Sequence, residues 1–162
     1  MKPSNKTKTA SPIQKIATAL RGGKAPGVYP GRRVRSFERI TMRLSGMRHL
    51  TEYEIVMSDG AAEVSSYGLR YENETETRVP RARIRTDASE VLNLLNRCRL
   101  ISWDGFDGPR PRGLKDGTDF RLDAVVNGGR RIRARGSQNF PRGYRKLVDW
   151  LYLKTREQET KK

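Results

Sequence analysis

Two stretches of alternating apolar and polar residues, each turning back on itself at a glycine, constrain the fold of this chain most strongly. From Phe37 the apolar residues recur at every second position, which is the period of a strand with one buried face. The Asp59-Gly60 pair predicts a two-residue hairpin turn. Such a turn aligns the apolar faces without adjustment, with Met57 opposite Ala62, Ile55 opposite Val64 and Tyr53 opposite Ser66. Three antiparallel strands are expected, with Gly68 bending or ending the third.

The second hairpin is centred on Asn127-Gly128-Gly129. A three-residue loop places Ala124 opposite Ile132 and Leu122 opposite Ala134, whereas a two-residue loop would place Ala124 opposite Arg131. The shared apolar face favours the three-residue loop. The other face then carries a row of arginines and its cross-strand neighbours: Arg131, Arg133 and Arg135, with Asp123 opposite Arg133 and Arg121 opposite Arg135.

Two amphipathic helices complete the pattern. In DASEVLNLLNRC, Asp87 and Glu90 have capping-box spacing, and one stripe is apolar: Val91, Leu94, Leu95 and Cys98. FPRGYRKLVDWLYLKTR has Pro141 near its first turn and a second apolar stripe: Tyr144, Leu147, Val148 and Leu151. ETETRVPRARIR is expected to be an edge strand or extended segment, because Pro80 cannot donate to a central ladder.

This order of elements predicts an α+β fold. We expect an antiparallel sheet of about five to six strands, arranged as a β-meander, an edge segment, a helix, a β-hairpin and a last helix, with the helices on one face. A single domain is expected over residues 37–155, and residues 156–162 are expected to fray.

The N-terminal residues 1–36 differ from the rest in charge. The whole chain carries a formal net charge of +16, and no acidic residue precedes Glu38. We expect a basic, largely disordered tail with a short amphipathic helix at 11–21, capped by Ser11 and stopped by Gly22. Such an excess of positive charge indicates an anionic partner such as nucleic acid, and the alternative is an arginine-rich surface that serves only solubility.

Several classes of protein are disfavoured. The single cysteine, Cys98, excludes an internal disulfide and a multi-thiolate metal site, and its place on an apolar stripe favours a buried hydrophobe over a nucleophile. No apolar run approaches the roughly 20 residues that span a bilayer, and the N-terminus lacks the apolar core of a signal peptide. A cytoplasmic location without membrane contact is therefore expected.

The stretch ISWDGFDGPRPRGLKDGTDF, residues 101–120, raises the question of a catalytic or metal-binding loop. Its carboxylates are Asp104, Asp107, Asp116 and Asp119, which fall in two pairs with Arg110, Arg112 and Lys115 between them. That spacing does not match a calcium loop, and the interposed cations compete for the same oxygens. The favoured interpretation is a connection pinned to the core by Trp103 and Phe106, in which the aspartates cap turns or pair with arginines.

No catalytic residue, metal ligand or cofactor is therefore assigned. His49 is the only histidine and lies in a predicted turn, and no glycine-rich segment matches a nucleotide-binding loop. The arginine row repeats roughly every 7 Å, close to the spacing of phosphates along a nucleic-acid strand. The predicted contacts to an RNA or DNA backbone are Arg32, Arg33, Arg35, Arg121, Arg131, Arg133 and Arg135.

Three functions follow in order of preference. The first is a non-enzymatic module that binds nucleic-acid backbone through the basic tail and the arginine-faced hairpin. The second is a protein-interaction or accessory module that docks on a partner through residues 11–21. The third is an enzyme that uses the aspartate-rich loop.

Four segments also carry a resemblance: YEIVMSDG, LISWDGFD, DGTDFRLDAVVNGG and GSQNFPRGYRKLVDWL. In order and spacing, over roughly residues 51–153, the chain resembles a group of uncharacterised small bacterial α+β domains. In that group a WDGF-like loop follows a helix, a DG-x-x-F/W strand pair comes next, and a G-S-x-N-x-P turn opens the last helix. The resemblance implies the α+β architecture and no particular activity.

Overall fold

The computed structural model describes residues 30–47 and 49–159, which form one seven-stranded sheet with the order β4-β3-β2-β1-β6-β7-β5. Its strands are β1 (Phe37–Ser45), β2 (Leu50–Ser58), β3 (Ala61–Glu72), β4 (Thr75–Thr86), β5 (Asp107–Gly108), β6 (Asp119–Val126) and β7 (Arg130–Ser137). The helices are α2 (Ala88–Arg97) and α3 (Tyr144–Glu159), with short 3₁₀ turns η1 (Pro30–Arg32) and η2 (Leu100–Trp103). The predicted tail helix at 11–21 lies outside the described residues.

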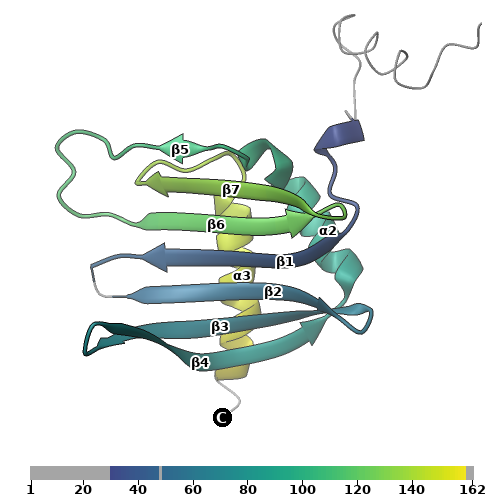
Figure 1. The fold of residues 1–162 in the computed structure, drawn as a ribbon, viewed down its shortest axis with the longest axis horizontal. Coiled ribbons are helices and arrows are strands. Elements are labelled where there is room, and N and C mark those ends of the chain that lie inside the picture. The colour runs from purple at the N-terminus through teal and green to yellow at the C-terminus, as the bar shows by residue number, and fades with distance from the viewer. Residues whose placement is uncertain (1–29, 48, 160–162) are drawn as a thin grey trace, which may run out of the picture.

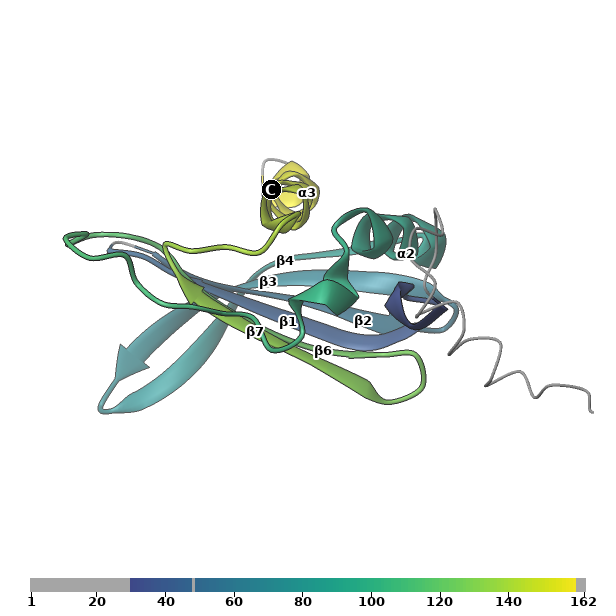
Figure 2. The ribbon, with the colours of Figure 1, turned by 90° about the horizontal axis from the view of Figure 1, so that it is seen from above.

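Both helices cover the same face of the sheet, as Figure 2 shows, and the α+β prediction is confirmed. α3 runs across the strands rather than along them (Figure 1). The core lies between the two layers, because the inward residues of the central strands meet the helix stripes there. Its largest fully buried side chains include Trp103, Ile40, Met42, Leu95 and Leu147. Among the described residues, no helix is long and apolar enough to span a bilayer.

The first hairpin has the predicted register. Strands β2 and β3 pair with Tyr53 opposite Ser66, Ile55 opposite Val64 and Met57 opposite Ala62. Asp59 and Gly60 both have positive φ, 48° and 75°, as a two-residue turn with the twist of the flanking strands requires.

Of the two outcomes predicted for Gly68, an end of the third strand is wrong, because β3 continues to Glu72. The far part of the β3–β4 hairpin does curl away from the helices, as Figure 2 shows. An irregularity lies across from Gly68, where the β3–β4 register shifts between Ser66 and Tyr67 and leaves Arg81 as the extra residue of a bulge. β4 is an edge strand, as Pro80 predicted.

The second hairpin also follows the prediction. β6 ends at Val126 and β7 begins at Arg130, so the loop has three residues. The register puts Ala124 opposite Ile132, Leu122 opposite Ala134, Asp123 opposite Arg133 and Arg121 opposite Arg135. Three consecutive positive φ angles, from Asn127 to Gly129, explain why asparagine and glycines occupy the loop.

The two helices bury the predicted stripes, but the capping box is not formed. Asp87 is the N-cap residue of α2 and makes no side-chain cap hydrogen bond. Glu90 turns toward α3, where it accepts hydrogen bonds from Trp150 Nε1 at 3.0 Å and pairs with Lys154 Nζ at 2.9 Å. The Glu90 carboxylate therefore contacts α3 instead of the backbone amide of a capping box. A charged ammonium together with an indole N–H stabilises a carboxylate more than one backbone amide does.

The aspartate-rich stretch is pinned to the core as predicted. Trp103 is fully buried and donates its Nε1 proton to the carbonyls of Cys98 and Arg142. It also contacts Phe120 at a ring-centroid distance of 6.5 Å. Cys98 is buried as well, and burial raises the pKa of its thiol to about 11, which is the behaviour of a core residue.

The sheet has seven strands rather than the predicted five to six, and β5 is the addition. It consists of Asp107 and Gly108, which pair in parallel with Arg135 and Gly136 of β7. Two residues among prolines and glycines show no periodicity, so this strand has no signal in the sequence.

Residues 33–36 enter β1 along a fixed path. Val34 is 2% exposed and belongs to the core, and its amide and carbonyl both bond to the side chain of Asn96 on α2. The side chain of Asn127 receives the amides of Arg35 at 2.7 Å and Ser36 at 3.3 Å and donates to the carbonyl of Arg33 at 2.9 Å. The β6–β7 turn therefore holds the segment that precedes β1.

Candidate nucleic-acid interface

The sheet face opposite the helices carries most of the charged side chains of the strands, and we call it the open face. Outward residues of each strand alternate with the core residues, so β1 contributes Arg39, Thr41 and Arg43 to it. No described helix covers this face (Figure 2). Its charges divide into two areas with different compositions.

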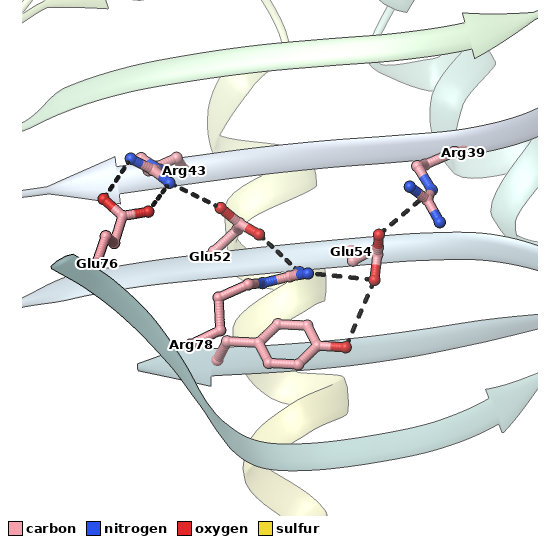
Figure 3. Close-up of polar contacts among 7 residues, drawn as sticks. Arg39, Arg43, Glu52, Glu54, Glu76 and Arg78 are labelled. Atoms are coloured by element: carbon pink, nitrogen blue, oxygen red, sulfur yellow. Dashed lines mark hydrogen bonds and ion pairs between the residues drawn. The ribbon is translucent and has the colours of Figure 1, made fainter. Parts of the chain in front are cut away.

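The first area, over β1, β2 and β4, is a compensated ion-pair network (Figure 3). It contains three arginines and three glutamates: Arg39, Arg43, Arg78, Glu52, Glu54 and Glu76. Glu52 is only 7% exposed and is flanked by Arg43 at 3.2 Å and Arg78 at 2.6 Å. Mutual neutralisation and burial make this area a poor attractor for a further anion.

Arg43 stays charged at the border of this network. Burial lowers the pKa of Arg43, but its hydrogen bonds to Glu76 and Glu52 outweigh burial and raise it above the ordinary value. Hydrogen bonds from Tyr71 and Arg43 in turn lower the pKa of Glu76. Both partners are therefore ionised at neutral pH.

The second area, which we call the arginine surface, comprises Arg121, Arg131, Arg133 and Arg135 on β6 and β7. Arg131 and Arg133 share one carboxylate, Asp123, at 3.2 and 3.4 Å, and Arg135 pairs with Asp107 at 2.9 Å. The side chains of the three β7 arginines remain 57%, 64% and 66% exposed. Four guanidinium groups thus face two paired carboxylates, and the excess is positive.

Within the arginine surface, Arg121 is the arginine whose charge is not paired with a carboxylate of the described residues. It makes no hydrogen bond or ion pair with any residue that the structure describes, and it lies between two other arginines in one cross-strand row. Arg43 of β1 is directly opposite on one side and Arg135 of β7 on the other. Like charges directly opposite one another destabilise a sheet.

This row of three arginines lines a hollow of about 530 Å³ on the open face. Tyr71 lines it from one side, because the tip of the β3–β4 hairpin curls over the open face, as Figure 2 shows, and Glu76 of that tip reaches Arg43. Asp107 and Pro109 line the other side. Asp119 is the remaining carboxylate at the hollow, together with the hydroxyls of Ser45 and Ser137.

The predicted tail contacts divide between two places. Arg33 and Arg35 are exposed on the segment that Asn127 holds, beside the β6–β7 turn. Arg130 of that turn donates to the carbonyl of Gly31 at 2.7 Å, which brings η1 and Arg32 to the same end of the sheet. The tail arginines therefore lie at the β6–β7 turn end of the sheet, where Arg33 and Arg35 line a hollow with α2, whereas the hollow of the arginine row lies at the other end of β6 and β7.

The sequence did not identify Arg43 as a candidate, whereas Tyr71 is one of the three tyrosines, with Tyr67 and Tyr152, that it offers as possible stacking groups. Arg43 joins the row only because β1 pairs with β6, a contact between strands far apart in the chain. Tyr71 is 64% exposed at the hollow. Tyr152 is 50% exposed on α3, and the guanidinium of Arg156 lies over its ring at 5.6 Å. The Tyr67 ring is covered by the guanidinium of Arg78 at 3.9 Å.

The aspartates of 101–120 have structural partners. Asp104 accepts a hydrogen bond from the Arg133 amide at 3.1 Å, and Asp107 pairs with Arg135. Among residues 30–47 and 49–159, no group of three or more histidine, cysteine, aspartate or glutamate side chains is placed to hold a metal ion. His49 is exposed next to β2.

No protein-family model, curated protein or solved structure matches the chain.

Proposed function

We propose that this protein binds nucleic acid through the sugar-phosphate backbone, using the arginine surface and the adjoining Arg33 and Arg35. The observation that carries the proposal is the row Arg43, Arg121 and Arg135, in which the central residue has no described partner. A sheet that needed only solubility on this face would alternate charges across its strands, as the neighbouring network does. An anion bound at the row would offset the repulsion.

The shape of the surface fits an extended polyanion. Arg131, Arg133 and Arg135 repeat along β7 at roughly 7 Å, and Arg33 and Arg35 lie beyond the β6–β7 turn, next to α2. Contacts of this kind neutralise phosphates without reading base sequence. Tyr71, beside the hollow, offers a ring face on which an unpaired base can stack, which favours single-stranded over duplex ligands.

The test is fluorescence anisotropy with a labelled single-stranded oligonucleotide over a range of salt concentrations. We expect log affinity to fall linearly with log salt. Replacing Arg121, Arg131 and Arg133 with glutamine should weaken binding at least about tenfold at low salt and reduce the slope by roughly two to three.

Arg83 and Arg85 provide a control that removes two positive charges, against three in the surface variant. They lie on edge strand β4, and Arg83 already pairs with Glu63 at 3.2 Å. A variant with glutamine at both positions lowers the net charge by two. It should change the slope of log affinity against log salt by less than the loss of a single arginine of the arginine surface does. Equal losses in both variants, or no binding at low salt, would contradict the proposal.

A protein-interaction role through residues 11–21 remains the alternative, and these residues lie outside the described part of the chain. A deletion that separates the two functions should remove residues 1–29 only, because Val34 belongs to the core. The backbone proposal predicts weakened but salt-dependent binding after that deletion. The alternative predicts unchanged nucleic-acid affinity and loss of a protein partner.

A further inference from the structure

A second hollow lies on the helix-covered side, between α3 and the adjoining part of the sheet, and has a volume of about 360 Å³. Its floor is made by neighbouring positions of three adjacent strands: Thr51 and Tyr53 of β2, Ser66 of β3 and Arg81 of β4. We call it the Arg81 cleft. It lies on the opposite face of the sheet from the arginine surface and is independent of the proposed function.

Ser66 is the first reason to regard the cleft as a binding site. The residue is 3% exposed, and its Oγ is the one buried side-chain polar atom of the described residues that has no hydrogen-bond partner. Leaving a buried hydroxyl unsatisfied costs roughly 1–3 kcal/mol. Folds therefore seldom retain such a group without a partner from outside the chain.

Arg81 is the second reason. The bulge between Ser66 and Tyr67 makes it the unpaired residue of β4 and directs its side chain across Gly68. A Cβ at Gly68 would lie 2.7 Å from Arg81 Nη2, so only glycine leaves the guanidinium this position. Within the described residues, Arg81 forms no ion pair and no hydrogen bond. A cation has thus been placed beside the unsatisfied hydroxyl by a bulge, a feature that often occurs next to binding sites.

The distances suit one small anionic group. Ser66 and Gly68 are two positions apart on the same face of β3, about 7 Å along the strand. A carboxylate between the Ser66 hydroxyl and the guanidinium over Gly68 can accept from both at ordinary charge-assisted lengths, about 2.8 Å. Tyr53, directly opposite Ser66, also lines the cleft with its side chain beside Thr155, and burial raises the pKa of its hydroxyl, so it stays protonated at neutral pH.

The remaining walls combine apolar and charged side chains. Leu44 and Val148 provide half-buried apolar surface, and α3 contributes Asp149, Arg156 and Glu159. The cleft volume of about 360 Å³ and the apolar wall accommodate a single carboxylate on a small apolar body. We propose that the Arg81 cleft binds a small monocarboxylate, with Arg81 and Ser66 holding the carboxylate and the apolar body facing Leu44 and Val148.

The test is a titration of the full-length protein followed by amide chemical shifts in two-dimensional NMR. The probes are acetate, butyrate and benzoate, with benzamide as the uncharged analogue of benzoate and inorganic phosphate as the competing oxyanion. We expect saturable shifts centred on Thr51, Ser66 and Arg81 with butyrate and benzoate, and weaker binding of acetate, phosphate and benzamide.

Variants decide the assignment. Arg81→Gln should weaken benzoate binding about tenfold or more, and Arg83→Gln, a neighbour on the same strand that pairs with Glu63, should leave it unchanged. Gly68→Ala, which displaces only the end of the Arg81 side chain, should weaken it several-fold. The proposal is overturned if none of the three carboxylates saturates, if benzamide or phosphate binds as well as benzoate, or if Arg81→Gln binds like the wild type.

Discussion

Arg121 of β6 and Arg43 of β1 occupy directly opposite positions on adjacent strands, and Arg121 has no compensating carboxylate among the described residues. Because like charges in this arrangement repel, Arg121→Thr should raise the free energy of unfolding by about 0.5 kcal/mol at low salt. The gain should shrink as salt screens the charges. Urea unfolding at two ionic strengths measures both effects.

The same variant should bind oligonucleotide more weakly if Arg121 serves binding. Higher stability together with lower affinity is the combination that distinguishes a binding residue from a residue of the fold. Arg39→Thr is a suitable comparison, since Arg39 pairs with Glu54 at 3.3 Å and its loss should not stabilise the protein. An Arg121→Thr protein that is less stable than the wild type would contradict the account of this row.

Asp107 partly neutralises the arginine surface through Arg135. Asp107→Asn should therefore increase the affinity for single-stranded oligonucleotide a few-fold at low salt, because the Arg135 guanidinium becomes available to phosphate. Stability should change by less than about 1 kcal/mol, since the pair is exposed. Anisotropy titrations measure the affinity, and Asp149→Asn on α3 controls for the change in net charge. Equal gains from the two variants would show that only total charge matters.

Glu90 joins α2 to α3, and this contact should make stability depend on pH. The Lys154 ammonium and the Thr86 hydroxyl lower the pKa of Glu90 to about 2 from its ordinary 4.5. A lowered folded-state pKa stabilises the protein above the unfolded value, and the contribution is lost as pH falls from about 4.5 toward 2.

Glu90→Gln should accordingly lower the free energy of unfolding at pH 7 by roughly 1 kcal/mol, a value reduced for the partial exposure of the carboxylate. The difference between variant and wild type should narrow below the ordinary glutamate pKa. Urea unfolding at intervals of pH gives the curve. Glu72→Gln, at an exposed position near the end of β3, is the control. A difference in the free energy of unfolding between Glu90→Gln and the wild type that persists at low pH would contradict the assignment.

Asn127 should hold residues 33–36 in place through its side chain. Asn127→Ala loses three hydrogen bonds and puts alanine at a φ of 51°, which asparagine tolerates better. It should therefore lower the free energy of unfolding by about 2 kcal/mol. Asn127→Gly removes only the side chain and tolerates the same φ. Urea unfolding gives the stabilities, and amide hydrogen exchange at Arg35 and Ser36 should accelerate in both variants. Exchange that is unchanged in Asn127→Gly would show that the backbone path does not depend on these bonds.

The comparison of sequence and structure is instructive at particular residues. The register at Ile55 and Ala124 was predictable, because a tight turn and a period of two are both local properties. The anchoring of the aspartate-rich stretch by Trp103 was predictable from the aromatic residues within it. The capping box predicted at Asp87 is wrong, because the Glu90 carboxylate instead accepts from donors on α3, about 60 positions away in the chain.

By itself, the sequence determined the two hairpins, their exposed arginines and the faces that the helices bury, because each depends on residues close together in the chain. Only the tertiary structure decided what lies beside those arginines. The pairing of β1 with β6 sets Arg43 next to Arg121, and the curl of the β3–β4 tip brings Tyr71 to the same hollow. Likewise Gly68, which the sequence predicted to bend or end a strand, makes room for Arg81. These neighbours are distant in sequence, and the packing of the whole chain brings them together.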